Sequence, residues 1–156
     1  MIFGNSVIGF GVLIRLSTDF VPNIGIMLIP MKRSVAVMIF KGDTVLSIRR
    51  SDEDDELPGI WGLPAGTFRD AETIKDLIMR IGRDKLGVEL EPVRKLAAGR
   101  QFRTRYLLEM DLWEAAMKGT HEHSQWRWAT IESLQPGAAA GSLCCELAVQ
   151  QKSRVR

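Results

Sequence analysis

The chain has 156 residues, 46% of them hydrophobic and 26% charged, which is the composition of an ordinary globular protein and the length of one domain. Its formal net charge is only +2 and it has no long run of lysine or arginine, which argues against a nucleic acid polymer as its ligand. The two cysteines, Cys144 and Cys145, are neighbours. We expect two buried thiols there, because a disulfide between adjacent residues is strained.

The first thirty residues are apolar and rich in glycine. Arg15 and Asp19 interrupt them, and no positive charge precedes Val7, so the segment fits neither a membrane helix nor a secretory signal. We therefore predict a cytoplasmic protein with no membrane partner. Our hypothesis is that Met31 is the natural first residue and that residues 1–30 are an extension outside the native protein. The alternative is an additional hairpin packed on the domain.

From residue 31 onward the pattern predicts strands and turns. Residues 35–40 place apolar side chains on both faces of a strand, which favours burial on both sides. Residues 41–43 form a turn signal, and residues 44–48 are expected to be the return strand. The nearly all-acidic run 51–56 is typical of a solvated loop. Glycine and proline in residues 57–66 then argue against a helix.

A helix is predicted after this loop. Asp70 is the expected N-cap, with Glu72 in the first turn, where the helix dipole favours a negative charge. Gly87 is the expected C-cap. Apolar residues recur at helical spacing and form one stripe: Ile74, Leu77, Ile78 and Ile81.

The rest of the chain is expected to return to strands and to end in a helix. The pattern predicts strands at 93–101, 104–113 and 125–129, a helical turn at 131–134 ended by Pro136, and a helix at 142–150. Trp126 and Trp128 share one strand face, which favours core packing. Hairpins combined with one central helix indicate an α+β layered sandwich.

Five residues within 66–88 have the spacing of a known motif. They fit the pattern G-x5-E-x7-R-E-U-x-E-E-x-G-U, in which U is aliphatic: Gly66, Glu72, Arg80, Gly87 and Val88. The segment resembles the Nudix box of the Nudix hydrolase superfamily, whose members include MutT-like proteins. Residues 61–66, the pair Arg49-Arg50 and residues 122–128 also resemble the family. The similarity spans residues 31–150, leaving 151–156 as a tail.

This resemblance implies a fold and an activity. The expected fold is an α/β/α sandwich with a mixed central sheet. The expected activity is hydrolysis of a diphosphate linkage in a nucleoside diphosphate derivative or a nucleoside triphosphate, with Mg²⁺ or Mn²⁺ as cofactor. The expected partner is thus a small phosphorylated substrate, and a homodimer is also implied. By their match to the motif, Glu72 and Arg80 would support the arrangement of loop and helix.

The sequence departs from the motif at the positions that bind metal. After Arg80, the three carboxylate positions hold Ile81, Asp84 and Lys85, so their formal charge rises from −3 to zero. Mg²⁺ usually needs one or two carboxylates beside the substrate phosphates. Gly82 also replaces an aliphatic residue, at an expected cost of about 1 kcal/mol of helix stability relative to alanine.

Three hypotheses follow from these departures. In the first, the protein is a hydrolase whose metal is held by Asp84, the backbone carbonyl of Ala65 and Glu122, with help from the acidic run 52–56. Arg49 is then the leading phosphate contact, and Gly66 lets the backbone approach the substrate. The flanking residues His121 and His123 are expected to be solvent-exposed.

In the second hypothesis the domain binds a nucleotide without cleaving it. The Lys85 ammonium then stands in the place of the metal, and Arg49 or Arg50 binds another phosphate oxygen. In the third, the protein is a structural or interaction domain without a small ligand. Phe102 and Tyr106 could stack on a base, but the sequence does not place them in a pocket.

Overall fold

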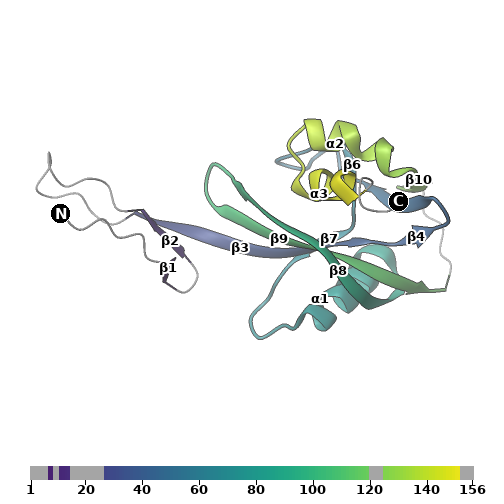
Figure 1. The fold of residues 1–156 in the computed structure, drawn as a ribbon, viewed down its shortest axis with the longest axis horizontal. Helices are drawn as coiled ribbons and strands as arrows, with labels where there is room; N and C mark the ends of the chain where they lie inside the picture. The colour runs from purple at the N-terminus through teal and green to yellow at the C-terminus, as the bar shows by residue number, and fades with distance from the viewer. Residues whose placement is uncertain (1–6, 9–10, 15–26, 120–124, 152–156) are drawn as a thin grey trace, which may run out of the picture.

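The computed structural model describes residues 7–8, 11–14, 27–119 and 125–151 (Figure 1). Its larger sheet has six strands, in the order β1-β2-β3-β9-β8, with β7 paired to β3. These strands are β1 (Val7–Ile8), β2 (Gly11–Ile14), β3 (Met27–Met38), β7 (Ala65–Thr67), β8 (Glu89–Phe102) and β9 (Leu107–Lys118). The four-stranded smaller sheet consists of β4 (Phe40–Lys41), β5 (Thr44–Arg49), β6 (Trp61–Gly62) and β10 (Trp126–Ala129).

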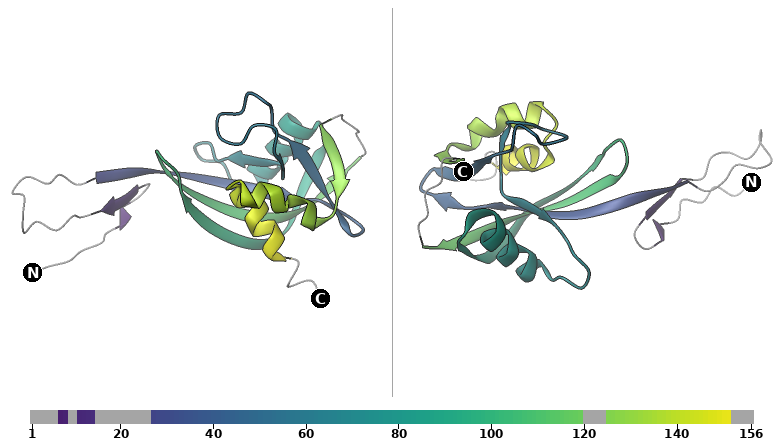
Figure 2. Two further views of the ribbon diagram at one scale, coloured as in Figure 1. Left: turned by 90° about the horizontal axis from the view of Figure 1, so that it is seen from above. Right: turned by 180° about the vertical axis from the view of Figure 1, so that it is seen from behind.

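The larger sheet is mixed and lies between helices. Strand β3 runs parallel to β9 and antiparallel to β7, whereas β8 and β9 are antiparallel. Helix α1 (Ile74–Ile81) lies on one side of this sheet, and helices α2 (Gln135–Ala139) and α3 (Leu143–Gln151) lie on the other (Figure 2). The α+β sandwich with a mixed central sheet, predicted from the sequence, is therefore confirmed.

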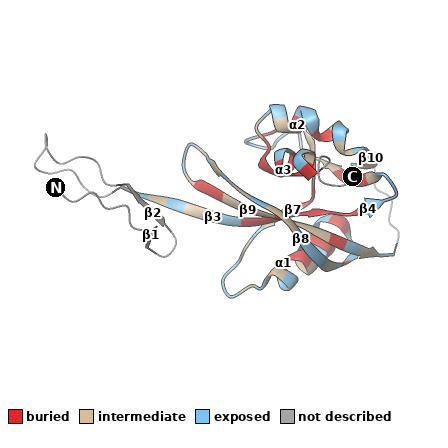
Figure 3. Ribbon diagram, in the orientation of Figure 1, coloured by how far each residue is buried: buried red, intermediate tan, exposed pale blue. Residues whose placement is uncertain are grey.

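Strand β3 separates two apolar cores because both of its faces are buried (Figure 3). Val35 and Val37 pack in the core that contains α1, and Ala36 and Met38 pack in the core that contains α3. The alternation along residues 35–40 predicted this arrangement, except that Phe40 is exposed. Trp126 and Trp128 pack against the α1 core, also as predicted.

Helix α1 begins later than the sequence pattern predicts. Its N-cap is Thr73, not Asp70. The Thr73 hydroxyl accepts a hydrogen bond from the Asp76 backbone N–H, and the Asp76 carboxylate accepts one from the Thr73 N–H, each at 3.1 Å. This reciprocal capping box satisfies two backbone donors, whereas a cap at Asp70 would satisfy only one. Glu72 is consequently placed just before the helix, outside its first turn.

The C-terminal end of α1 widens into a π-helical turn, η1 (Gly82–Leu86). Gly87 ends it in the left-handed conformation with φ 66°, as predicted for the C-cap. Gly82 has a role that helix propensity does not reveal. A Cβ atom there would lie 2.7 Å from the Val88 carbonyl oxygen and 2.8 Å from Leu90 Cγ. Gly82 is thus required for the close packing of η1 against the start of β8, and its expected cost to the helix is outweighed.

We predict that Gly82→Ala lowers the free energy of unfolding by about 2 kcal/mol, because the added methyl overlaps a backbone carbonyl. Intrinsic helix propensity alone would predict stabilisation. The measurement is urea unfolding followed by circular dichroism, with the exposed neighbour Arg83→Ala as the control. A Gly82→Ala protein at least as stable as the wild type would show that the close approach of η1 to the Val88 carbonyl does not require a glycine.

Several later boundaries differ from the sequence pattern. Strands β8 and β9 are longer than predicted, and β8 accommodates Pro92 beside a register shift between Pro92 and Arg94. The helical turn η2 (Ile131–Leu134) is where it was expected. Pro136 does not end helical structure there but lies in the first turn of α2, where a missing N–H costs nothing.

The N-terminal strands lie away from the body of the domain (Figure 1). Strand β1 pairs with β2, and β2 pairs with residues 27–30 of β3. Strand β3 continues through Met31 without a break. That residues 1–30 lie outside the native protein stays a prediction. Among the described residues, no helix is long and apolar enough to cross a membrane.

Candidate functional site

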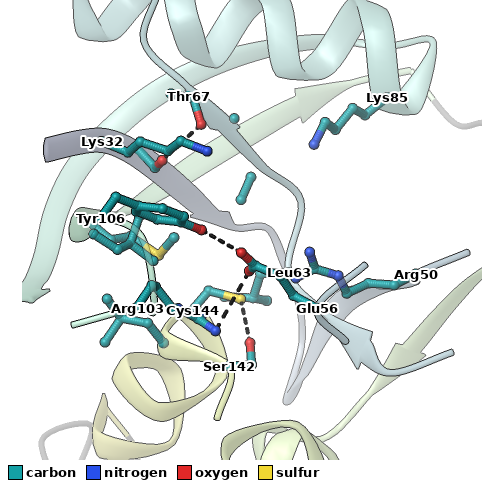
Figure 4. A pocket seen from close by; sticks show the side chains of 16 residues that line it. Lys32, Arg50, Glu56, Leu63, Thr67, Lys85, Arg103, Tyr106, Ser142 and Cys144 are labelled. Atoms are coloured by element: carbon teal, nitrogen blue, oxygen red, sulfur yellow. Dashed lines mark hydrogen bonds and ion pairs between the residues drawn. The ribbon is translucent and has the colours of Figure 1, made fainter. Parts of the chain in front are cut away.

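A pocket of about 220 Å³ opens beside β3 and β7, below η1 (Figure 4). Its walls also include the turn between β8 and β9 and the start of α3. Among the described lining residues, four side chains are cationic and one is a carboxylate, Glu56. The cations come from four separate parts of the chain: Lys32, Arg50, Lys85 and Arg103. The pocket therefore suits an anionic ligand.

The ion pair between Glu72 and Arg80 fixes one wall of this pocket. Arg80 Nε and Nη2 donate to the two Glu72 carboxylate oxygens at 2.7 and 2.9 Å, and Nη2 also donates to the Thr67 carbonyl oxygen at 2.8 Å. The side chains are only 15% and 10% exposed. Arg80 thus ties the loop before α1 and the end of β7 to the helix, which is the supporting arrangement that the motif implies.

Gly66 allows β7 to approach α1 closely. A Cβ atom at this position would lie 3.0 Å from Ile81 Cγ1 and 3.1 Å from Leu77 Cδ1. The glycine therefore brings the pocket wall, formed by Ala65 to Thr67, directly against the helix. Ala65 and Gly66 both line the pocket, and their expected roles in metal and substrate binding stay predictions.

We predict that Glu72→Gln lowers the free energy of unfolding by about 2 kcal/mol at pH 7, because Arg80 loses its charged acceptor. The hydrogen bond from Arg80 is the main cause that lowers the pKa of Glu72 from 4.5 to about 2. A carboxylate with a lowered pKa stabilises the folded state above its unfolded pKa, and this contribution is lost as the pH falls toward the folded value. The difference between variant and wild type should therefore shrink between pH 4.5 and pH 2.

Chemical denaturation across this pH range measures the effect, and Asp70→Asn, an exposed residue of the same loop, is the control. A difference between Glu72→Gln and the wild type that did not depend on pH would contradict the assignment of the stabilisation to the ionised pair.

The residues at the motif's metal-binding positions do not converge. Ile81 is 1% exposed and packs in the α1 core. Asp84 is exposed and does not line the pocket, whereas Lys85 does. Within the described part of the chain, no three His, Cys, Asp or Glu side chains lie close enough to hold a metal. These residues do not fit a divalent ion. Glu122, the other expected ligand, and its neighbours His121 and His123 lie outside the described residues.

The two adjacent arginines differ in position. Arg50 lines the pocket and pairs with Asp54 at 3.0 Å. Arg49, the leading phosphate contact expected from the sequence, is not among the residues that line it and donates to Asp52 at 2.6 Å. Arg49 is the last residue of β5 and Arg50 follows it. Neighbouring side chains of an extended segment point to opposite sides, so only one of the pair faces the pocket.

Lys85 has no ion-pair partner among the described residues, and its ammonium points into the pocket (Figure 4). Its pKa is lowered from 10.5, first by partial burial and then by the positive charges of Arg50 and Arg80. A bound anion would offset this repulsion. The ammonium is thus available for a ligand.

The pocket also contains groups that the sequence did not assign to it. Tyr106 lines it and donates a hydrogen bond to Glu56 at 2.6 Å, while Phe102 is 68% exposed on the surface. Burial, and then the bond to Glu56, raises the pKa of Tyr106. Lys32 and Arg103 lie in the pocket because β3 pairs with β9, and this register has no local sequence signal.

The adjacent thiols are free and buried, as predicted. Cys144 lines the pocket, and its thiol lies 3.2 Å from the Ser142 hydroxyl. The hydrogen bond between the two thiols lowers the pKa of Cys144 and raises that of Cys145, and the charge of Arg50 also lowers the pKa of Cys144.

The order of strands and helices, together with the motif helix beside a basic pocket, agrees with the sandwich that the motif implies. The sequence model of a protein family, the NUDIX domain, matches residues 30–143 of this chain. The chain belongs to the NUDIX family, as the motif predicted.

Solved structures agree with this assignment of the fold. The ORF135 protein of E. coli is 23% identical, with a TM-score of 0.65 over 80% of this chain and 93% of that one. The MutT protein of Methanosarcina mazei is 18% identical, with a TM-score of 0.66 over 81% of this chain and 97% of that one. An ADP-ribose pyrophosphatase of Streptococcus suis is 17% identical, with a TM-score of 0.56 over 78% of this chain and 91% of that one. No curated protein sequence matches this chain.

Proposed function

We propose that the pocket binds a small phosphorylated molecule and that the Lys85 ammonium supplies the positive charge that a divalent metal generally supplies in Nudix hydrolases. One observation carries this proposal. Of the three motif positions that would hold carboxylates, Ile81 is buried in the core, Asp84 lies outside the pocket and Lys85 lines it.

The electrostatics of the pocket support an anionic ligand. Lys85 lacks an ion-pair partner among the described residues, and Arg50 shares its charge with Asp54 alone. An ammonium and a guanidinium facing one space match the spread of charge on a diphosphate group, since the guanidinium can donate two parallel hydrogen bonds and the ammonium acts as a point charge.

The size of the pocket limits how much of the ligand it encloses. Its volume of about 220 Å³ is below the range of about 300–1,000 Å³ that is common for drug-sized ligands. We infer that it encloses the phosphates and the adjoining group of a nucleoside diphosphate derivative or a nucleoside triphosphate. The named activity of one structural neighbour, an ADP-ribose pyrophosphatase, is consistent with this class.

Hydrolysis of the diphosphate linkage is the second candidate function. It is favoured by membership of the family and by the position of Ala65, whose carbonyl was an expected metal contact and which lines the pocket. The ligand set expected from the sequence for this activity is Asp84 and Glu122 with Mg²⁺ or Mn²⁺. Asp84 lies outside the pocket, so this function is the second candidate. The cytoplasmic location and the homodimer likewise stay predictions.

We predict that ADP binds in the presence of EDTA and that Lys85→Ala weakens this binding about tenfold or more, because a charge-assisted hydrogen bond is lost. Isothermal titration calorimetry measures both effects, and Arg83→Ala, an exposed cation of the same π-helical turn, is the matched control. Equal weakening by both variants would point to a general loss of positive charge instead of a specific contact.

A phosphate-release assay separates the two candidate functions. Binding in EDTA without turnover in Mg²⁺ or Mn²⁺ would support the binding function. Metal-dependent turnover that is lost in Asp84→Ala, together with binding that EDTA abolishes, would overturn it and establish the hydrolase.

A further inference from the structure

Glu56 is the one carboxylate among the described residues that line the pocket, and it faces the space between the cations (Figure 4). Its Oε1 atom accepts the short hydrogen bond from the Tyr106 hydroxyl at 2.6 Å. Its Oε2 atom lies 3.6 Å from Arg103 Nη1, which is an ion pair but is too long for a hydrogen bond. Among the described residues, Oε2 therefore has no hydrogen-bond donor.

The carboxylate is held in a defined position. The Asp54 Oδ1 atom accepts from the backbone N–H groups of Glu56 and Leu57, at 3.0 and 2.8 Å, which fixes the loop beneath Glu56. Tyr106 is in turn fixed by the Lys32 ammonium, 4.2 Å from its ring centroid. The Glu56 carboxylate is therefore held in one orientation. Its Oε1 atom accepts a hydrogen bond from Tyr106, and its Oε2 atom can accept one from a ligand.

A carboxylate in a basic anion pocket opposes the binding of phosphate, unless it contacts a part of the ligand that donates hydrogen bonds. Arg50 lies in the loop between β5 and β6, and Lys85 lies in η1. Both are on the opposite side of the pocket from Tyr106 (Figure 4). Two of the four cations thus lie across the pocket from Tyr106, while Lys32 and Arg103 lie beside Tyr106 and Glu56. Glu56 offers a hydrogen-bond acceptor to hydroxyl groups of a ligand whose phosphates contact Arg50 and Lys85. Sugar phosphates carry both kinds of group on adjoining atoms.

We propose that Glu56 is a specificity-determining residue that accepts hydrogen bonds from sugar hydroxyl groups of a ligand whose phosphates lie against Arg50 and Lys85. This rests on the function proposed above. Tyr106 is a positioning residue, because it acts through Glu56. The pocket then selects phosphorylated sugars, including the ribose of nucleoside diphosphates, over phosphates that lack alcohol groups.

The test compares two ligands of equal charge, ADP and 2′,3′-dideoxy-ADP, by calorimetry in EDTA, with inorganic pyrophosphate as a third probe. The wild type should bind ADP about tenfold more tightly than the dideoxy analogue, as expected for a hydrogen bond to a charged acceptor. Glu56→Ala should bind the two nucleotides equally and bind pyrophosphate more tightly than the wild type, since a like charge is removed.

Two further variants make the result specific. Glu53→Ala removes the same charge from an exposed position of the same loop and should keep the wild-type preference for ADP. Tyr106→Phe should lose part of that preference with unchanged affinity for pyrophosphate, which a merely structural role would not produce. The hydrogen bonds that Asp54 accepts come from the backbone N–H groups of Glu56 and Leu57, so Glu56→Ala retains them.

The outcomes distinguish this inference from the function on which it rests. Equal binding of both nucleotides by the wild type, or an ADP preference that survives in Glu56→Ala, would overturn the role of Glu56 while leaving the phosphate pocket in place. If none of the three probes bound to the wild type or to Glu56→Ala, both the pocket function and the role of Glu56 would be rejected.

Discussion

The ion pair between Glu72 and Arg80 is the interaction on which the rest of the site depends. It closes the loop before α1 onto the helix, and through the Thr67 carbonyl it also holds β7. Because Gly66 lets β7 lie directly on α1, the same contact sets the distance between the pocket wall and η1. Lys85 and the Ala65–Thr67 segment therefore face one space, although nothing bonds them directly.

The pocket is built on this frame by long-range pairing. The parallel register of β3 and β9 brings Lys32 beside the turn that carries Tyr106. The loop after β5 adds Arg50 and Glu56, and the start of α3 closes the floor with Cys144. The outcome is a site in which cationic side chains from four separate parts of the chain face one space.

The sequence predicted the parts of this structure that have local signals. The two-sided apolar pattern of residues 35–40, the stripe of α1 and the left-handed Gly87 all depend on neighbouring residues, and all were recovered. The helix start was not, because Asp70 and Thr73 are both good caps and only the reciprocal bond with Asp76 decides between them. The pocket residues from distant strands had no local signal, since register is set by the packing of the whole sheet.

The burial of Ile81 makes a carboxylate at this motif position difficult to accommodate. This residue is part of the core between α1 and β3, and its side chain also packs where Gly66 leaves room. A glutamate restored at this position would have to bury a carboxylate among apolar side chains, which is strongly unfavourable without a partner. A metal-binding carboxylate at this position would thus require the helix, the loop and the core to change together.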